Sequence, residues 1–208
     1  MLFRSRPNFF ANTPDILHEY LQTGGRPAFQ IRLILAATLA ASYGIYSGFE
    51  LCENRAIRGT EEYLDSEKYQ VRAWDWDRPG HIKELIARVN QIRQNNPALH
   101  FNERLRFYPT THDQLICYAK TTEDLTNIIL VAVNLDPHHP QEGWVQVPIH
   151  ELGIAPDETY PVHDLISNAR YLWRGEWNYI RLDPAVFPAH LFRVRRKIQT
   201  EKDFDPFM

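Results

Sequence analysis

The 208-residue sequence is poor in cysteine, with only Cys52 and Cys117, and these two lie far apart without the spacing of a CxxC pair. Small secreted domains held together by disulfides need a denser cysteine pattern than this. We therefore expect no disulfide, and we interpret both residues as buried thiols of a protein in a reducing compartment.

The sequence also lacks a basic excess and a long apolar run. Its 23 Lys and Arg residues are balanced by 26 Asp and Glu residues, which excludes a broad positive surface for nucleic acid or anionic lipid. No apolar stretch of signal-peptide length follows Met1, and the most apolar window, residues 31–46, is interrupted by Arg32 and Ser42. We expect a soluble, cytoplasmic protein with no nucleic-acid or membrane partner.

The residues that are present allow a substantial core, because 44% are hydrophobic and 12% are aromatic. Before Pro97, apolar residues recur mainly at helical spacing. The pattern predicts a short helix after Asp15 that ends at Gly24-Gly25, a buried helix over 27–41 and a helix over 81–94. A short buried strand is expected over 43–48, followed by an irregular loop over 49–79 that we interpret as the substrate loop.

Beyond Ala98 the apolar pattern changes to period 2 and to short runs separated by turn residues. At least six strands at such spacing predict a β-sandwich. The predicted strands cover residues 115–119, 128–134, 143–148, 159–164, 178–182 and 189–194. The charged residues from Lys197 onward are aperiodic and are expected to form a frayed tail.

One carboxylate near the N-terminus has an unusual setting, in the segment Asn12-Thr13-Pro14-Asp15. Pro14 fixes its own φ and favours an extended Thr13, so Asp15 is expected at a corner between a strand and the head of a helix. An Asp in this position caps a helix far more often than it takes part in catalysis. The residues alone leave both interpretations open.

Four segments, in the same order, resemble the C-terminal third of the alpha-1,4-glucan:maltose-1-phosphate maltosyltransferases, which are members of the alpha-amylase clan (glycoside hydrolase family 13). They are residues 12–19, 42–53, 61–69 and 81–99, and the likeness extends from Met1 to about Arg196. The wider clan usually has His directly before the aspartate that matches Asp15, whereas this sequence has Pro14. That difference favours the maltosyltransferase branch over an ordinary amylase.

The resemblance implies an α/β part followed by an all-β part. Residues 1–97 would form the C-terminal end of a (β/α)8 TIM barrel, residues 98–197 an antiparallel β-sandwich domain, and residues 198–208 a flexible tail. A complete barrel of this type needs about 250 residues. The chain is therefore expected to be a fragment of a longer enzyme.

The resemblance also implies roles for individual residues. Asp15 matches the third catalytic carboxylate, which stabilises the transition state, and Lys68 and Tyr69 match a pair that contacts the far glucosyl unit of the donor. Glu50 matches an acidic residue just after the last barrel strand. The nucleophile and the general acid/base would lie upstream of Met1, and neither a cofactor nor a metal is implied.

The activity implied is transfer of maltosyl units from alpha-maltose 1-phosphate to the non-reducing end of alpha-1,4-glucans, as in glycogen-like glucan synthesis, with retention of configuration. The intact enzyme would be a homodimer, and the isolated chain is expected to be inactive. Two alternatives remain open: hydrolysis of alpha-glucans, or a non-catalytic β-sandwich module that acts in packing or glucan binding.

Overall fold

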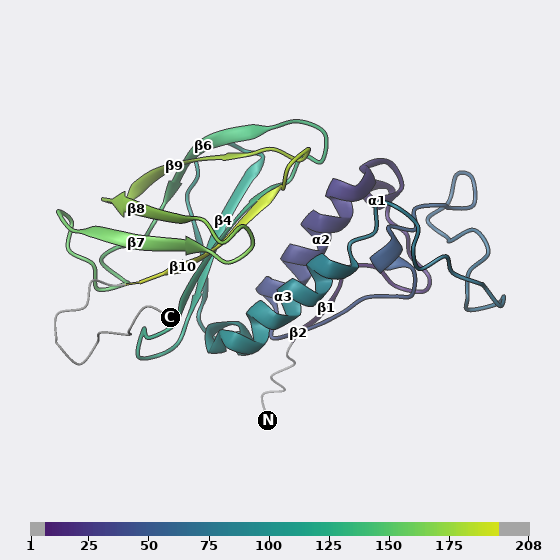
Figure 1. The fold of residues 1–208 in the computed structure, drawn as a ribbon, viewed down its shortest axis with the longest axis horizontal. Coiled ribbons are helices and arrows are strands. Elements are labelled where there is room, and N and C mark those ends of the chain that lie inside the picture. Colours follow the sequence, from purple (N-terminus) through teal and green to yellow (C-terminus); the bar gives the residue numbers. More distant parts are fainter. Residues whose placement is uncertain (1–6, 196–208) are drawn as a thin grey trace, which may run out of the picture.

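The computed structural model describes residues 7–195, so the expected tail lies outside the described residues. Its helices lie between a β domain on one side and a long irregular segment on the other (Figure 1). The helices are α1 (Glu19–Thr23), α2 (Gly25–Leu39) and α3 (Lys83–Asn95), and two 3-10 turns, η1 (Phe49–Leu51) and η2 (Pro97–His100), accompany them. Strands β1 (Asn8–Phe10) and β2 (Ser42–Gly44) form a small parallel pair.

The β domain consists of a six-stranded antiparallel sheet and a two-stranded sheet. The large sheet has the order β3-β4-β5-β10-β7-β8, and β6 pairs with β9. The strands are β3 (Leu105–Tyr108), β4 (Leu115–Thr121), β5 (Ile128–Asn134), β6 (Gln141–Gln146), β7 (Thr159–Asp164), β8 (Arg170–Arg174), β9 (Trp177–Leu182) and β10 (Ala189–Val194). The predicted antiparallel β domain is confirmed. Strands β3 and β8, which are short and mostly exposed edge strands, were not predicted.

Strand β5 divides the hydrophobic interior in two. All seven of its residues are buried, and successive side chains point to opposite faces of the sheet. Ile128, Leu130 and Ala132 enter a core shared with β6 and β9, whereas Ile129 and Val131 enter a core shared with the helices. The apolar sequence from Ile128 to Val133 is therefore explained by the covering of β5 on both faces.

The helices pack on the face of the sheet opposite to β6 and β9. Helix α2 is the predicted buried helix, and Thr38 near its end shares a 2.6 Å hydrogen bond with Tyr118 on β4. Arg88 of α3 donates two hydrogen bonds to the carbonyl oxygen of Leu165 in the β domain. Polar and apolar contacts thus join the helices to the β domain.

Two local predictions were wrong. Asp15 does not head a helix. Helix α1 begins only at Glu19, with His18 as its cap. The start is later than expected because Leu17 is buried and its N–H donates to the carbonyl of Glu61. Strand β2 is only partly buried, since only β1 pairs with it among the described residues. Gly24 ends α1 as predicted, and it also caps α2, which begins at Gly25.

No helix in the part of the chain that the structure describes is long and apolar enough to cross a membrane. Residues 7–195 also form no closed barrel, since β1 and β2 make the only parallel pair among them.

Asp164, at the end of β7, provides a test of the β domain. Its buried carboxylate accepts hydrogen bonds from Ser167 Oγ (2.6 Å) and lies 3.0 Å from His190 Nδ1. Burial alone would raise the pKa of Asp164, but the hydrogen bonds from His190 and Ser167 outweigh burial and hold it below the ordinary 3.8. The stability that this carboxylate contributes is present above pH 3.8 and is lost as pH falls through the lower folded pKa.

We therefore predict that Asp164→Asn lowers the free energy of unfolding at neutral pH by about 1–3 kcal/mol. Below pH 4 the wild-type chain should lose stability more steeply than the variant. Urea unfolding at a series of pH values measures both effects, with the exposed Asp157→Asn as the control. If the free energy of unfolding of Asp164→Asn and of wild type fell with the same slope below pH 4, this account would be wrong.

Candidate active site

Asp15 lies in a short turn between β1 and α1, and its side chain is largely exposed. The turn is held by Thr13, whose Oγ1 accepts from the Ile16 N–H at 3.1 Å, and by the 2.6 Å bond from Leu17 N–H to the carbonyl of Glu61. Because His18 caps α1, the Asp15 carboxylate is not used by the helix. The interpretation of Asp15 as a helix cap is therefore excluded.

The structure brings Asp15 together with both other predicted site residues. Lys68, 53 residues along the chain, donates from Nζ to Asp15 Oδ1, and the same Nζ lies 5.2 Å from the centre of the Tyr69 ring. The hydrogen bond to Asp15 is the main cause that raises the pKa of the Lys68 ammonium above its ordinary value. Lys68 is therefore a cation at neutral pH, paired with the Asp15 carboxylate and beside an exposed aromatic ring.

A small hollow of about 160 Å³ lies at this point. The exposed Tyr69, a residue 78% accessible, and the buried Tyr63 both line it. Its lining residues are Pro14, Asp15, Ile57, Glu62, Tyr63, Asp65, Ser66, Tyr69 and Gln70. Carboxylates, hydroxyls and an aromatic face are groups that contact the hydroxyls and the apolar faces of a sugar.

Asn12 fixes the floor of the site. It is buried, its Nδ2 donates to Tyr63 Oη at 2.6 Å, and its Oδ1 accepts from the Tyr46 N–H at 2.7 Å. Burial raises the pKa of Tyr63 to about 12, so its hydroxyl stays protonated. Asn12 therefore connects the end of β1 to the segment after β2 and to the loop that carries Lys68.

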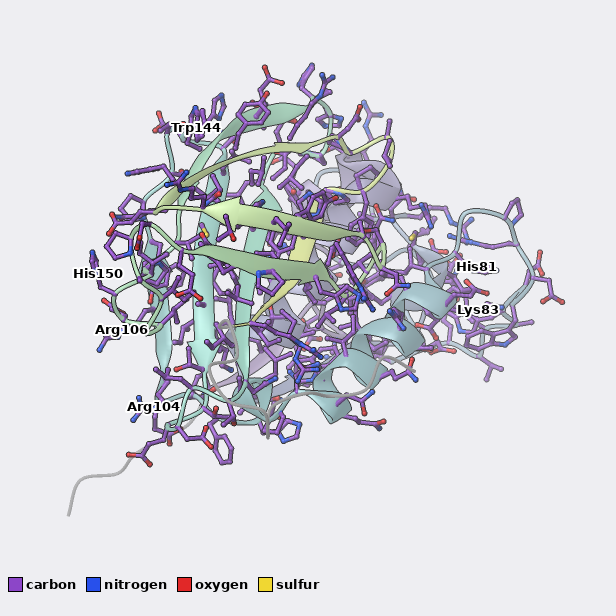
Figure 2. The ribbon with its side chains drawn as sticks, turned by 60° about the vertical axis from the view of Figure 1, so that its left-hand side comes forward. His81, Lys83, Arg104, Arg106, Trp144 and His150 are labelled. Carbon is purple, nitrogen blue, oxygen red and sulfur yellow. The ribbon has the colours of Figure 1, made fainter. Side chains whose placement is uncertain are left out.

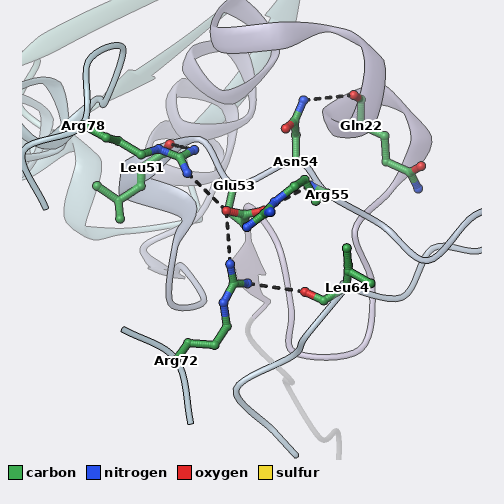
Figure 3. A network of polar contacts seen from close by, with 8 residues as sticks. All are labelled: Gln22, Leu51, Glu53, Asn54, Arg55, Leu64, Arg72 and Arg78. Carbon is green, nitrogen blue, oxygen red and sulfur yellow. Dashed lines mark hydrogen bonds and ion pairs between the residues drawn. The ribbon is translucent and has the colours of Figure 1, made fainter. Parts of the chain in front are cut away.

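The loop itself, residues 52–82, contains no helix or ladder-forming strand, and a buried carboxylate organises it (Figure 3). Glu53, with a side chain 2% exposed, accepts from Arg55 Nε at 3.0 Å, Arg78 Nη1 at 3.2 Å and Arg72 Nη2 at 3.4 Å. Burial would raise the pKa of Glu53, yet the hydrogen bond and charge of Arg55 and the charge of Arg72 hold it below the ordinary value. Glu53 is thus ionised inside a ring of three cations.

Glu53 and its arginines were not predicted from the sequence. The four residues share no motif, because the loop that joins them has no periodicity and its geometry arises only in three dimensions. Glu50, which the sequence did single out, lies in η1, where its carbonyl accepts from the Ile82 N–H at 2.8 Å. Its side chain makes no contact with Asp15 among the interactions of the described residues.

The described residues contain neither a metal site nor a reactive cysteine. Among residues 7–195 no group of three or more His, Cys, Asp or Glu residues could hold a metal ion. Cys117 is buried as predicted, and burial raises its pKa to about 12; Cys52 is only half-buried, and burial raises its pKa to about 11. Neither thiol is activated as a nucleophile.

The fold places the chain in a known structural class. It is similar to the α-amylase of Geobacillus thermoleovorans complexed with acarbose (TM-score 0.63, 13% identity, 93% of this chain and 40% of that chain). It is also similar to AmyP in complex with maltose (TM-score 0.64, 14% identity, 95% and 42%). At these identities the comparison shows the fold alone: that of a part of an α-amylase.

Sequence similarity is more specific. Residues 107–194 match the family model described as GLGE, C-terminal. The chain is 54% identical to the alpha-1,4-glucan:maltose-1-phosphate maltosyltransferase of Rhodospirillum rubrum and 52% identical to maltosyltransferase 2 of Streptomyces coelicolor, over 91% and 92% of its own length. It spans 28% and 29% of the length of these relatives. The predicted resemblance is confirmed.

We predict that Asn12→Ala lowers the free energy of unfolding by about 1–3 kcal/mol, because the buried Tyr46 N–H and Tyr63 hydroxyl lose their partner. Urea unfolding of the chain measures the loss. The matched control is Asn54→Ala: this exposed side chain makes a single 3.2 Å bond to the Gln22 carbonyl (Figure 3), so a change within about 0.5 kcal/mol is expected. Equal losses for the two variants would contradict a special role for Asn12.

Proposed function

We propose that this chain is the C-terminal part of an alpha-1,4-glucan:maltose-1-phosphate maltosyltransferase. The intact enzyme transfers maltosyl units from alpha-maltose 1-phosphate to the non-reducing end of alpha-1,4-glucans. The observation that carries this proposal is the contact between Lys68 and Asp15, with Tyr69 beside them, in a chain that is similar to such enzymes along nine-tenths of its length.

Each residue has a role in this chemistry. Retaining transfer needs a nucleophilic carboxylate and an acid/base carboxyl about 5–5.5 Å apart around an oxocarbenium-like transition state. Both belong to the part of the enzyme before residue 1, and Asp15 is the supporting carboxylate that stabilises the transition state. Lys68 and Tyr69 close the donor site around the second sugar. The chain alone is inactive, because it lacks the two groups that divide the reaction into accessible steps.

The division of the chain follows from the same proposal. Residues 1–97 are the end of the catalytic (β/α)8 barrel, residues 98–197 the β-sandwich domain and residues 198–208 the tail. A hollow of about 500 Å³ lies against β1 and α2, and the exposed rings of Phe9 and Phe10 border it. These apolar groups supply a surface on which preceding barrel strands can pack.

The enzyme so described acts in the cytoplasm in glycogen-like glucan synthesis, as a homodimer, and needs no cofactor. The amylase-like fold supports a second candidate, hydrolysis of alpha-glucans. The two differ in one measurable respect, because only the maltosyltransferase consumes maltose 1-phosphate and releases phosphate.

A chimeric enzyme tests the proposal directly. Residues 1–208 replace the matching C-terminal part of the Rhodospirillum rubrum maltosyltransferase, with which the chain is 54% identical. We expect phosphate release from maltose 1-phosphate in the presence of a glucan acceptor, and none from the 208-residue chain alone. A folded chimera that hydrolyses glucan but does not use maltose 1-phosphate would replace the proposal by the second candidate.

In this chimera we predict that Asp15→Asn lowers kcat by about 10²–10³-fold, a cost typical of losing one preorganised electrostatic group, and changes donor KM much less. The carboxylate interacts more strongly with the transition state than with the ground state. Initial rates of phosphate release measure the effect. Asp157→Asn, an exposed aspartate in the β domain, is the control, and a wild-type kcat for Asp15→Asn would remove Asp15 from the mechanism.

We also predict that Lys68→Ala combined with Tyr69→Ala raises the donor KM and reduces kcat/KM for maltose 1-phosphate by about tenfold, because hydrogen bonds to a neutral sugar are each worth about 0.5–1.5 kcal/mol. The preference for maltose 1-phosphate over glucose 1-phosphate should fall. The matched control replaces another adjacent basic residue and tyrosine, Arg170 and Tyr171 on β8, by alanine. Unchanged donor preference with a normal melting curve would show that the loop pair does not select the donor.

A further inference from the structure

The loop that carries Lys68 and Tyr69 has little regular backbone structure to hold it. Between η1 and α3 the described residues form turns and one isolated bridge, between Ala56 and Tyr63. Lys68 and Tyr69 are themselves exposed. Isolated backbone hydrogen bonds, such as that from the Leu64 N–H to the Arg55 carbonyl, hold single turns. Contacts that join distant parts of the loop come mainly from side chains.

Glu53 supplies three of these contacts at separate points of the loop. It binds Arg55 near the start, Arg72 after Tyr69 and Arg78 near the end. Two of the arginines also bind backbone: Arg72 donates to the carbonyl of Leu64 at 3.4 Å, and Arg78 donates to the carbonyl of Leu51 (Figure 3). The stretch from Leu64 to Arg72, which contains Lys68 and Tyr69, is thus closed on itself by the Arg72 guanidinium, which Glu53 holds.

A continuous series of contacts runs from Glu53 to Lys68. The Arg72 guanidinium, bound to Glu53, lies over the Trp74 ring at 4.0 Å from its centre. Trp74 Nε1 donates to Glu67 Oε1 at 2.7 Å, and Glu67 directly precedes Lys68. The Trp74 ring also fills the space beside Gly48 (φ +88°), where an added Cβ would lie 2.6 Å from the ring.

We propose that Glu53 is a positioning residue that holds Lys68 and Tyr69 at Asp15 through Arg72, Trp74 and Glu67, and so sets donor binding. The inference rests on the proposed function for its consequence, the affinity for a maltosyl donor. Glu53 itself does not contact the donor in this proposal. The energetic reason is that the buried Glu53 carboxylate and the largely buried Arg72 guanidinium cannot separate without leaving unpaired charge inside the protein.

The first test is Glu53→Gln in the chimera. The amide keeps the size of the side chain and removes the charge that attracts three arginines. We expect the KM for maltose 1-phosphate to rise about tenfold, with kcat changed by less than about threefold, because remote binding contacts are lost while Asp15 remains. Glu53→Asp, which retains the charge on a shorter stem, should give a smaller rise in KM.

A loss of stability alone must be distinguished from loss of positioning. Asp164→Asn is the matched control, since the Asp164 side chain is as deeply buried, 2% exposed, and lies in the β domain away from the loop. It should lower Tm without altering the donor KM. If Glu53→Gln shifts Tm and leaves KM at the value of Asp164→Asn, Glu53 is merely structural and the proposal is overturned.

Trp74→Phe provides an independent variant in case Glu53→Gln does not fold. Phenylalanine keeps an aromatic ring at this position, but it removes the N–H that binds Glu67 and the part of the indole that packs beside Gly48. We expect a KM increase of about threefold, with a smaller loss of Tm than in Glu53→Gln. An unchanged KM in this variant would show that the contact between Trp74 and Glu67 does not affect donor binding, and it would overturn the inference.

Hydrogen exchange of the 208-residue chain separates this inference from the proposed function. Amides of residues 64–72 should exchange at least about tenfold faster in Glu53→Gln than in wild type, and at the wild-type rate in Asp164→Asn. If the wild-type chimera does not use maltose 1-phosphate, the proposed function fails, while exchange still decides whether Glu53 holds Lys68. Equal exchange in Glu53→Gln and wild type overturns the positioning role itself.

Discussion

The double burial of strand β5 is the constraint on which the arrangement of the molecule depends. Its side chains alternate between a core under β6 and β9 and a core under the helices, so neither face of the large sheet can be exposed without opening apolar surface to water. The helices are thereby held against the β domain, and the long loop emerges on their far side (Figure 1). In Figure 2, His81 and Lys83 at the start of α3 lie on the opposite side of the molecule from Trp144 and Arg106 of the β domain. The apolar cores thus determine where the candidate site lies, but not its internal geometry.

That internal geometry is electrostatic. Around Glu53 the carboxylate and Arg72 are largely buried and the contacts are multiple, so their loss leaves unpaired charge in a poorly hydrated place. Around Asp15 the charges are exposed, and an exposed ion pair contributes little to stability because water and salt screen it. The two clusters therefore differ in what they can do. The Glu53 cluster is suited to hold backbone in place, whereas Lys68 can exchange its contact with Asp15 for the hydroxyls of a ligand at small cost.

The position of Asp15 follows from competition between a helix and a tertiary hydrogen bond. Pro14 and the apolar residues after it favour an early helix start, but Leu17 is drawn into the core and its N–H is taken by the loop carbonyl of Glu61. His18 then caps α1, and the carboxylate remains available. The same loop that carries Lys68 thus also determines that Asp15 is not a capping residue.

The sequence by itself determined the helices over α2 and α3, the change to period 2 after Ala98 and six of the β-domain strands, because burial on one or both faces leaves a periodic trace along the chain. It also marked Asp15, Lys68 and Tyr69 through four segments that resemble maltosyltransferases, although their roles stay proposals. Tertiary structure alone decided that Asp15 and Lys68 are in contact, and that Glu53 gathers three arginines. The physical reason is that these contacts join irregular segments far apart in sequence, where no period relates one partner to the other and only the closed loop brings them within hydrogen-bond distance.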